Sequence, residues 1–324
     1  MTIPPPQSLG HGIHLIPAPL PFKSPAWVNA YAIEDDEGLF LIDCGTDWEP
    51  GRIALRVGME SLGLDESAVH TLLVSHLHPD HVGMSSRLVR ELGCRFVMHE
   101  RAAELVPRYN DTPGYAQRLR SIAHTHGVPE QVIEATTRAN RPDYMPIIDP
   151  PDHLVADGDE ISLSADRRLL VVHTPGHESS HICLRDSRTD VLFSGDHVLP
   201  RISPVIMYDP DFGDPLGDYL ASLRKLIAME IGLTYPAHGT LIDHGGERAR
   251  QILLHHDRRL RDMTDLVRSA ATTAWNVMTQ SFRPNLDPVG ARLAFLETIS
   301  HLEYLRIRGR VQGEQREGKT IYRV

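Results

Sequence analysis

Residues 75–81 read SHLHPDH, and they follow directly after the apolar run VHTLLV. Histidine and aspartate side chains therefore crowd the end of a segment typical of a buried strand. Neutral imidazole and carboxylate are ligands that zinc and similar divalent cations accept. His76 and His78 are two residues apart, so in an extended segment they point the same way, whereas Asp80 and His81 lie on the following turn. This one loop can supply two ligands to each of two neighbouring cations.

Three further loops place ligand-type residues directly after apolar runs. HTPGH follows RLLVV and presents His177, SGD follows VLF and presents Asp196, and PAHG follows GLTY and presents His238. Asp196 has two carboxylate oxygens and can therefore bridge two cations. Because each loop follows a strand-like run, we expect all four loops to meet at one edge of the fold.

The rest of the chain alternates short β-rich runs with helical patterns. Strands are expected at 27–33, 38–45, 70–75 and 95–99 and over EISLS, RLLVVHT, HICLRD and VLFSGD, and helices at 50–64, 82–92 and 215–229. A group of strands followed by a helix occurs twice along the chain. It predicts an α+β fold in which two sheets pack face to face with helices outside, a four-layer αββα sandwich.

Two segments depart from this rhythm. Residues 100–150 look helical and form an insertion, whose tyrosines (Tyr109, Tyr115 and Tyr144) serve either as a lid over an apolar acyl group or as packing. Residues 251–324 hold 12 Lys and Arg against 8 Asp and Glu, whereas the whole chain has a net charge of -10. The pattern predicts a catalytic domain over residues 1–250 and a small C-terminal module of helices and a hairpin, similar to a winged helix, over 251–324.

Composition restricts the cellular compartment that we expect for the protein. Cys44, Cys94 and Cys183 are widely spaced, with no CxxC pair, so we expect free thiols in a reducing cytoplasm. Neither a secretory leader in the first 25 residues nor an 18-residue apolar run is present, so we expect no contact with a membrane.

LIDCG, SHLHPDH, HTPGH, SGD and PAHG, in this order, resemble the motifs of the metallo-β-lactamase-fold hydrolases over roughly residues 12–245. The resemblance implies that one cation is held by His76, His78 and His177, the other by Asp80, His81 and His238, and that Asp196 bridges both. It also implies that Asp43 of LIDCG orients a ligand or the loop behind the site.

The resemblance further implies a metal-dependent hydrolase with two divalent ions, zinc first, with iron or manganese as alternatives. A metal-bridging hydroxide would attack the substrate, and Asp80 would orient it as ligand and catalytic residue. We expect a small carboxylic ester or thioester as substrate, as in glyoxalase II-like enzymes. The alternatives are an endoribonuclease of the lactamase-like type, a lactonase and, least favoured, a metal-binding scaffold without turnover. Nucleic acid is the less favoured partner, and the oligomeric state, including a homo-oligomer, stays open.

The remaining histidines have less support as functional groups. His173 is expected to be structural, His181 and His197 are minority candidates for substrate contact, and four are expected to be solvated: His124, His126, His255 and His256. No predicted ligand lies in residues 272–324, so a chain lacking them is expected to keep both metals.

Overall fold

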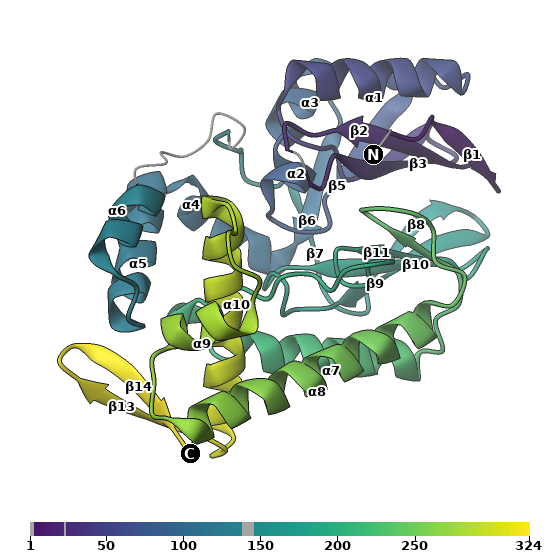
Figure 1. Cartoon of the computed structure of the whole chain (residues 1–324). Coiled ribbons are helices and arrows are strands. Elements are labelled where there is room, and N and C mark those ends of the chain that lie inside the picture. The colour runs from purple at the N-terminus through teal and green to yellow at the C-terminus, as the bar shows by residue number, and fades with distance from the viewer. Residues whose placement is uncertain (1–2, 23, 138–145) are drawn as a thin grey trace.

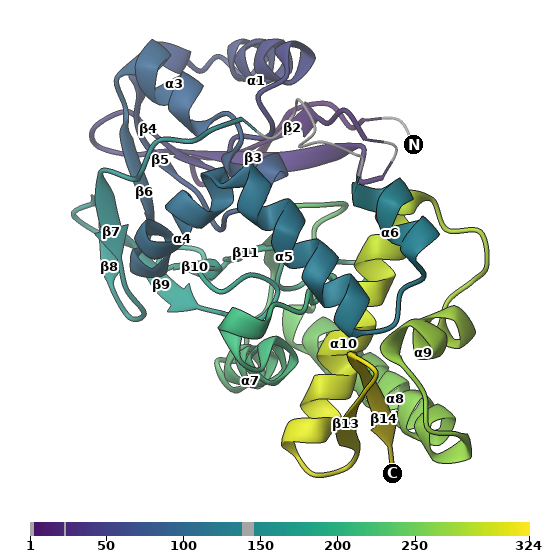
Figure 2. The ribbon, with the colours of Figure 1, turned by 90° about the vertical axis from the view of Figure 1, so that its left-hand side faces the viewer.

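Two sheets packed face to face form the centre of the molecule, and helices cover both outer faces (Figures 1 and 2). The computed structural model describes residues 3–22, 24–137 and 146–324. This is the predicted α+β sandwich of four layers. Among the described residues, no helix combines the length and apolar character that crossing a bilayer requires.

The first sheet has seven strands in sequential order, antiparallel from β1 to β4 and parallel from β4 to β7. Its strands are β1 (Gln7–Gly10), β2 (Ile13–Pro19), β3 (Trp27–Glu34), β4 (Leu39–Ile42), β5 (Val69–Leu73), β6 (Arg95–His99) and β7 (His153–Val155). The strands expected from residue 27 to residue 99 are confirmed. The structure adds β1, β2 and β7 to them.

The second sheet has five strands in the order β12-β11-β10-β9-β8, antiparallel except for the parallel pair β11 and β12. These are β8 (Glu160–Ser164), β9 (Arg167–His173), β10 (Ile182–Asp186), β11 (Leu192–Gly195) and β12 (Thr234–Pro236). All four strands expected in this half are confirmed. The core between the two sheets is partly aromatic, with the Tyr31 ring 5.2 Å from Phe193 and 5.7 Å from Tyr235.

Short helices lie over the first sheet, and three helices form the predicted insertion. They are α1 (Glu49–Ser61), η1 (Glu66–Ala68), α2 (Pro79–Val82) and α3 (Ser85–Leu92), then α4 (Glu100–Asn110), α5 (Thr112–Thr125) and α6 (Glu130–Thr137). Pro79 begins α2, where a proline loses no helical hydrogen bond, so the turn after His78 is stiff. Tyr144, one of the three tyrosines of the insertion, lies outside the described residues.

The C-terminal helices cover the second sheet (Figure 1). The elements on this side are η2 (Pro210–Phe212), α7 (Pro215–Ala228), α8 (Gly245–Ser269), α9 (Ala274–Ser281), α10 (Pro288–Ile307) and the hairpin β13 (Gln312–Arg316) with β14 (Lys319–Arg323). The expected order of helices and a terminal hairpin is present. That this module is a winged helix stays a prediction.

The predicted domain boundary at residue 250/251 falls inside α8. One hydrophobic cluster joins the outer face of the second sheet to the C-terminal helices, including Val172, Cys183, Leu223, Ile252 and Ile299. Leu119 of α5, in the insertion, belongs to the same cluster. The insertion and the C-terminal segment therefore pack on a shared core, and the division into two domains stays a prediction.

Two of the histidines expected to be solvated are buried. His126 is 5% exposed and His256 is fully buried, where its Nδ1 lies 3.0 Å from Nε2 of His301 on α10. His124 is exposed, as expected, and His255 is half-buried. The expectation for His126 and His256 was wrong because their burial comes from packing between the insertion, α8, α10 and the hairpin, which leaves no local pattern in the sequence.

Hydrogen bonds between the sheets fix the loop after β12. The Asn29 side chain on β3 donates from Nδ2 to the carbonyl oxygens of Pro236 at 2.9 Å and Gly239 at 3.0 Å. The Asn29 backbone N–H donates to Ala237 O at 2.7 Å. Tyr31 Oη also donates to Pro236 O, at 2.8 Å. The first sheet thus holds the PAHG loop of the second sheet in place.

Arg167 and Asp186 form a buried ion pair that also joins the sheets. Arg167 is 1% exposed, and its Nε and Nη2 donate to the two oxygens of Asp186 at 3.0 and 2.9 Å. Its Nη1 donates to the carbonyl oxygen of His11, between β1 and β2, at 2.8 Å. One guanidinium therefore bonds to both sheets.

Replacing Arg167 with methionine is expected to lower the free energy of unfolding by about 3–5 kcal/mol, because Asp186 would be left charged and unpaired in the interior. Urea unfolding followed by circular dichroism measures this difference. Arg188→Met is the matched control, since Arg188 pairs with Asp166 at the exposed surface and its loss is expected to change stability little. An Arg167→Met variant as stable as the wild type would contradict the prediction.

Candidate metal centre

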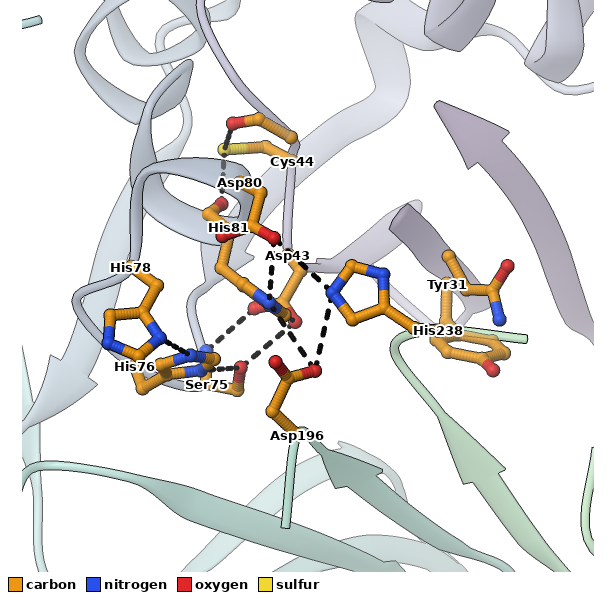
Figure 3. Close-up of polar contacts among 12 residues, drawn as sticks. Tyr31, Asp43, Cys44, Ser75, His76, His78, Asp80, His81, Asp196 and His238 are labelled. Carbon is orange, nitrogen blue, oxygen red and sulfur yellow. Dashed lines mark hydrogen bonds and ion pairs between the residues drawn. The ribbon is translucent and has the colours of Figure 1, made fainter. Parts of the chain in front are cut away.

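The seven side chains predicted as ligands lie together, and Figure 3 shows all of them except His177. Four of them come from the loop after β5 and from α2, and three come from loops of the second sheet. Their ligand atoms form two groups, each with all atoms within 4.8 Å of one another: His76, His78, His177 and Asp196 in one, and Asp80, His81 and His238 in the other. The structure thus brings together every residue that the four motifs predicted.

Asp196 lies between the two groups. Its Oδ2 is 3.6 Å from Nε2 of His177 in the first group. Its Oδ1 is 3.6 Å from Nε2 of His81 and 3.4 Å from Nε2 of His238 in the second group. Each carboxylate oxygen therefore faces a different group, which is the arrangement required of a bridging ligand.

The backs of the imidazole rings are held by hydrogen bonds to the protein. These bonds run from Nδ1 of His177 to Val205 O, from Nδ1 of His238 to Trp27 O and from Nδ1 of His81 to Asp43 Oδ2, each at 2.8 Å. Since a carbonyl or carboxylate oxygen can only accept, Nδ1 carries a proton in all three rings. The three Nε2 atoms face the site, which is where a metal ligand presents its donor atom.

Four buried atoms at the centre have no hydrogen-bond partner among the described residues. They are Nε2 of His81, His177 and His238 and Oδ1 of Asp196. A buried polar atom left unsatisfied costs about 1–3 kcal/mol. Divalent cations would satisfy all four at once, and imidazole with carboxylate is a donor set that zinc, iron or manganese accepts. The residues present therefore fit a site for two cations.

Asp43 bonds both to a predicted ligand and to the loop that carries it. Its Oδ1 accepts from the Ser75 backbone N–H at 2.7 Å, and its Oδ2 accepts from Ser75 Oγ at 2.9 Å and from Nδ1 of His81. Ser75 Oγ in turn lies 3.0 Å from Nδ1 of His76. One carboxylate thus supports a histidine of each group (Figure 3).

Burial keeps two histidines of the first group, His76 and His78, neutral. It lowers the pKa of His78 to about 3, and the neighbouring His177 adds to the effect. Burial, followed by the proximity of His81, also holds the pKa of His76 well below its usual range. Near neutral pH both rings are therefore neutral and able to bind a cation.

Carboxylates inside and beside the second group, from Asp80, Asp43 and Asp196, set its pKa values. Burial alone would lower the pKa of His81, but the nearby carboxylates, first Asp43 and then Asp196, outweigh burial and raise it. Burial would raise the pKa of Asp80, but His81 and His238 outweigh burial and lower it to about 2. Asp80 is therefore ionised near neutral pH, and the negative charge around it suits a cation.

His181 and His197 do not line the pocket beside the site. His181 is fully buried, and its Nε2 accepts from the backbone N–H of Asp196 at 3.1 Å while its Nδ1 bonds to Thr174 Oγ1 at 2.8 Å. His181 therefore positions the backbone of Asp196, a role that only the fold reveals. His197 is fully buried and its ring packs 4.6 Å from that of Tyr219 in α7.

His173 has the structural role expected of it. Its ring stacks on that of His99 at 4.0 Å, and its Nε2 lies 3.0 Å from Ser179 O. This contact joins the end of β9 to the end of β6 across the two sheets.

Comparisons with known proteins agree with the fold and the motifs. The family model described as the metallo-beta-lactamase superfamily matches residues 27–238. The probable metallo-hydrolase YqjP of Bacillus subtilis is 24% identical over 91% of this chain and 92% of its own length. The lactamase-like protein aptB of Emericella nidulans is 29% identical over 145 residues, 43% of this chain, and the match spans only 42% of aptB. The crystal structure of a metallo-beta-lactamase family protein from Thermus thermophilus superimposes with a TM-score of 0.81 and 30% identity, covering 98% of this chain and 99% of that chain.

Asp43→Asn is expected to weaken zinc binding by roughly 10- to 100-fold, the range for residues that orient metal ligands. An amide can no longer accept from both His81 and Ser75 in the present geometry. Competition with a chromophoric chelator measures the affinity. Asp35→Asn is the matched control, because Asp35 is a buried carboxylate paired with His70 outside the two groups. Equal zinc affinity in Asp43→Asn and Asp35→Asn would contradict the assigned role.

Proposed function

The chain belongs to the metallo-β-lactamase superfamily, and from this we propose that it is a metal-dependent hydrolase that cleaves small carboxylic esters or thioesters. The name of the Bacillus subtilis relative, a probable metallo-hydrolase, supports the hydrolase part of the proposal. The observation that carries it is the set of four buried, unpartnered ligand atoms that face one another beside a pocket.

Two divalent cations would be bound at the centre. One is assigned to His76, His78, His177 and Asp196, and the other to Asp80, His81, His238 and Asp196. When bound, such a pair supplies a Lewis acid for a carbonyl oxygen and lowers the pKa of water. A donor set of imidazoles and carboxylates without thiolate accepts zinc, iron or manganese, and zinc is proposed first.

Asp80 is the residue that orients the attacking water. Its carboxylate is ionised, and its side chain keeps 16% of its surface exposed, which gives a water molecule access. Its Oδ2 lies 3.3 Å from Nε2 of His238, so the carboxylate and the ring face the same point. A hydrogen bond from water to the carboxylate would aim the oxygen lone pair at the substrate carbonyl.

A pocket opens beside the first group and suits an apolar acyl group. It has a volume of about 140 Å³, and His78 and His177 form part of its wall. The apolar lining comes from α5, the segment before α7 and α10: Tyr115, Leu119, Ile122, Met207, Tyr208, Phe212 and Leu296. Such a lining binds an acyl chain or ring through burial of apolar surface. Tyr115 is therefore part of the pocket wall. Tyr109 instead packs against the hydrophobic cluster formed by the first sheet and the helices over it.

The charges of the pocket disfavour a polyanion. Glu178, Asp209 and Asp218 line it, and Arg118 is the one cationic side chain among its described lining residues. Arg118 also lies 3.4 Å from the carboxylate of Asp111. A nucleic acid would meet a negative surface here, so a small ester or thioester is favoured over RNA.

Purified protein is expected to hydrolyse members of a panel of acyl thioesters and aryl esters, because the pocket accepts an apolar acyl group beside the cations. Rates are followed with and without EDTA, and again after zinc is restored. Loss of hydrolysis with EDTA and recovery with zinc is the expected result. Cleavage of single-stranded RNA without any thioester or ester hydrolysis would overturn the substrate assignment, and inactivity of protein holding two metals would overturn the enzymatic role.

Asp80→Asn is expected to lower kcat by roughly 100- to 10,000-fold, because the amide cannot accept a proton or orient water as the carboxylate does. The fold should be retained, since no core apolar contact is lost. Asp47→Asn is the control, because Asp47 is a nearby carboxylate that pairs with Arg87 and is in neither ligand group. Steady-state kinetics and circular dichroism check both variants. A kcat near that of the wild type in Asp80→Asn would refute the role.

A further inference from the structure

The backbone segment 199–208 connects the metal centre to the pocket. Val205 O accepts the proton of His177 Nδ1 at 2.8 Å, so the position of this carbonyl sets the orientation of the ring. Two or three residues further on, Met207 and Tyr208 form part of the pocket wall. A shift of this segment would therefore move a ligand and the pocket wall together.

One turn of α10 holds this segment by two hydrogen bonds. Ser300 Oγ donates to Ile206 O at 2.8 Å, and the backbone N–H of Tyr208 donates to Leu296 O at 3.3 Å. Ser300 is 1% exposed and Ile206 is fully buried, so water does not compete for the bond. The two bonds flank the same stretch of backbone and fix it against the helix.

The Ser300 bond is not the one that a helical serine usually makes. A serine or threonine inside a helix commonly bonds to the carbonyl four residues earlier in its own helix. Thr298, two residues away on α10, does so, with Oγ1 donating to Ala294 O at 2.8 Å. Ser300 instead bonds outside its helix, to the carbonyl directly after the one that holds His177.

Arg248 of α8 holds the beginning of the same segment. Its Nε donates to Leu199 O at 2.7 Å, and its Nη2 donates to Ile202 O at 3.0 Å. Because the donors of a guanidinium have a fixed planar geometry, the two carbonyls are held relative to each other as well as to the helix. The segment is therefore anchored at both ends by C-terminal helices.

We infer that Ser300 and Arg248 are positioning residues for His177, and that the C-terminal helices belong to the catalytic unit. The inference rests on the proposed role of His177 as a metal ligand. It reverses the expectation that a chain lacking residues 272–324 keeps both metals, because that truncation removes Ser300 and the whole of α10. No ligand lies in the truncated part, yet the carbonyl that orients a ligand depends on it.

Ser300→Ala in the full-length chain tests the inference. Zinc titration against a chromophoric chelator reports two affinities, one for each cation. Only the affinity of the cation bound by His177 is expected to fall, by roughly 10-fold, the lower end of the range for residues that support metal ligands. Thr298→Val is the matched control, because it removes a buried hydroxyl from the same helix without touching the segment, and both affinities should stay at wild-type values.

Arg248→Met is a second variant that keeps the aliphatic stem of a half-buried side chain and removes both hydrogen bonds. It is expected to weaken the same cation, whereas Arg250→Met, an exposed change on the same helix, is not. The d–d absorption of cobalt-loaded protein gives an independent signature of ligand geometry. It should change in Ser300→Ala and Arg248→Met and not in the two controls.

Three outcomes would overturn the inference. Wild-type affinities for both cations in Ser300→Ala and Arg248→Met would remove the positioning role and leave the proposed function intact. An equal fall of both affinities, together with a lower free energy of unfolding, would mean that the two residues only stabilise the fold. A wild-type protein that binds no divalent cation would overturn the proposed function and this inference with it.

Discussion

The structure depends on a group of buried imidazoles and carboxylates whose free atoms face one another across the site. The Nε2 atoms of His81, His177 and His238 have protonated Nδ1 atoms behind them and no partner in front among the described residues. An arrangement of this kind opposes folding unless something satisfies those atoms. Divalent cations have the charge and coordination preference to do so, and cation binding would then contribute to the stability of the fold.

The two sheets contribute different ligands, so the centre exists only where they pack together. The first sheet leads into the loop that carries His76 and His78, and the second leads into the loops that carry His177 and Asp196. Hydrogen bonds between the two sheets fix how the loops lie relative to each other. Ile182 N, at the start of β10, donates to Ser75 O at 3.0 Å, and Ser75 directly precedes His76. The hydrogen bonds of Asn29 to the PAHG loop act in the same way on the other side. Helices outside the sheets complete the site. Helix α10 supplies Leu296 of the pocket wall and Ser300, whose hydroxyl donates to Ile206 O.

The sequence predicted which side chains come together because their signal is local: each follows an apolar strand, and strands of one sandwich end at a common edge. It also predicted the support from Asp43, which comes from a motif. The role of His181, the burial of His126 and His256 and the function of Ser300 could not be predicted, because each depends on contacts between segments far apart in the chain. The strands β1 and β2 were missed for a different reason, since their proline-rich stretch PPPQSLGHGIHLIPAP carries few strand signals. The C-terminal segment looked separate by charge, yet its helices share a core with the second sheet.

Anomalous diffraction at the zinc absorption edge, from crystals of the full chain grown with zinc, tests the central claim most directly. Two anomalous peaks are expected, one within reach of His76, His78 and His177, the other within reach of Asp80, His81 and His238, with Asp196 in contact with both. A map without peaks at these positions, with the same side chains turned away from one another, would contradict the two-cation centre and every role derived from it.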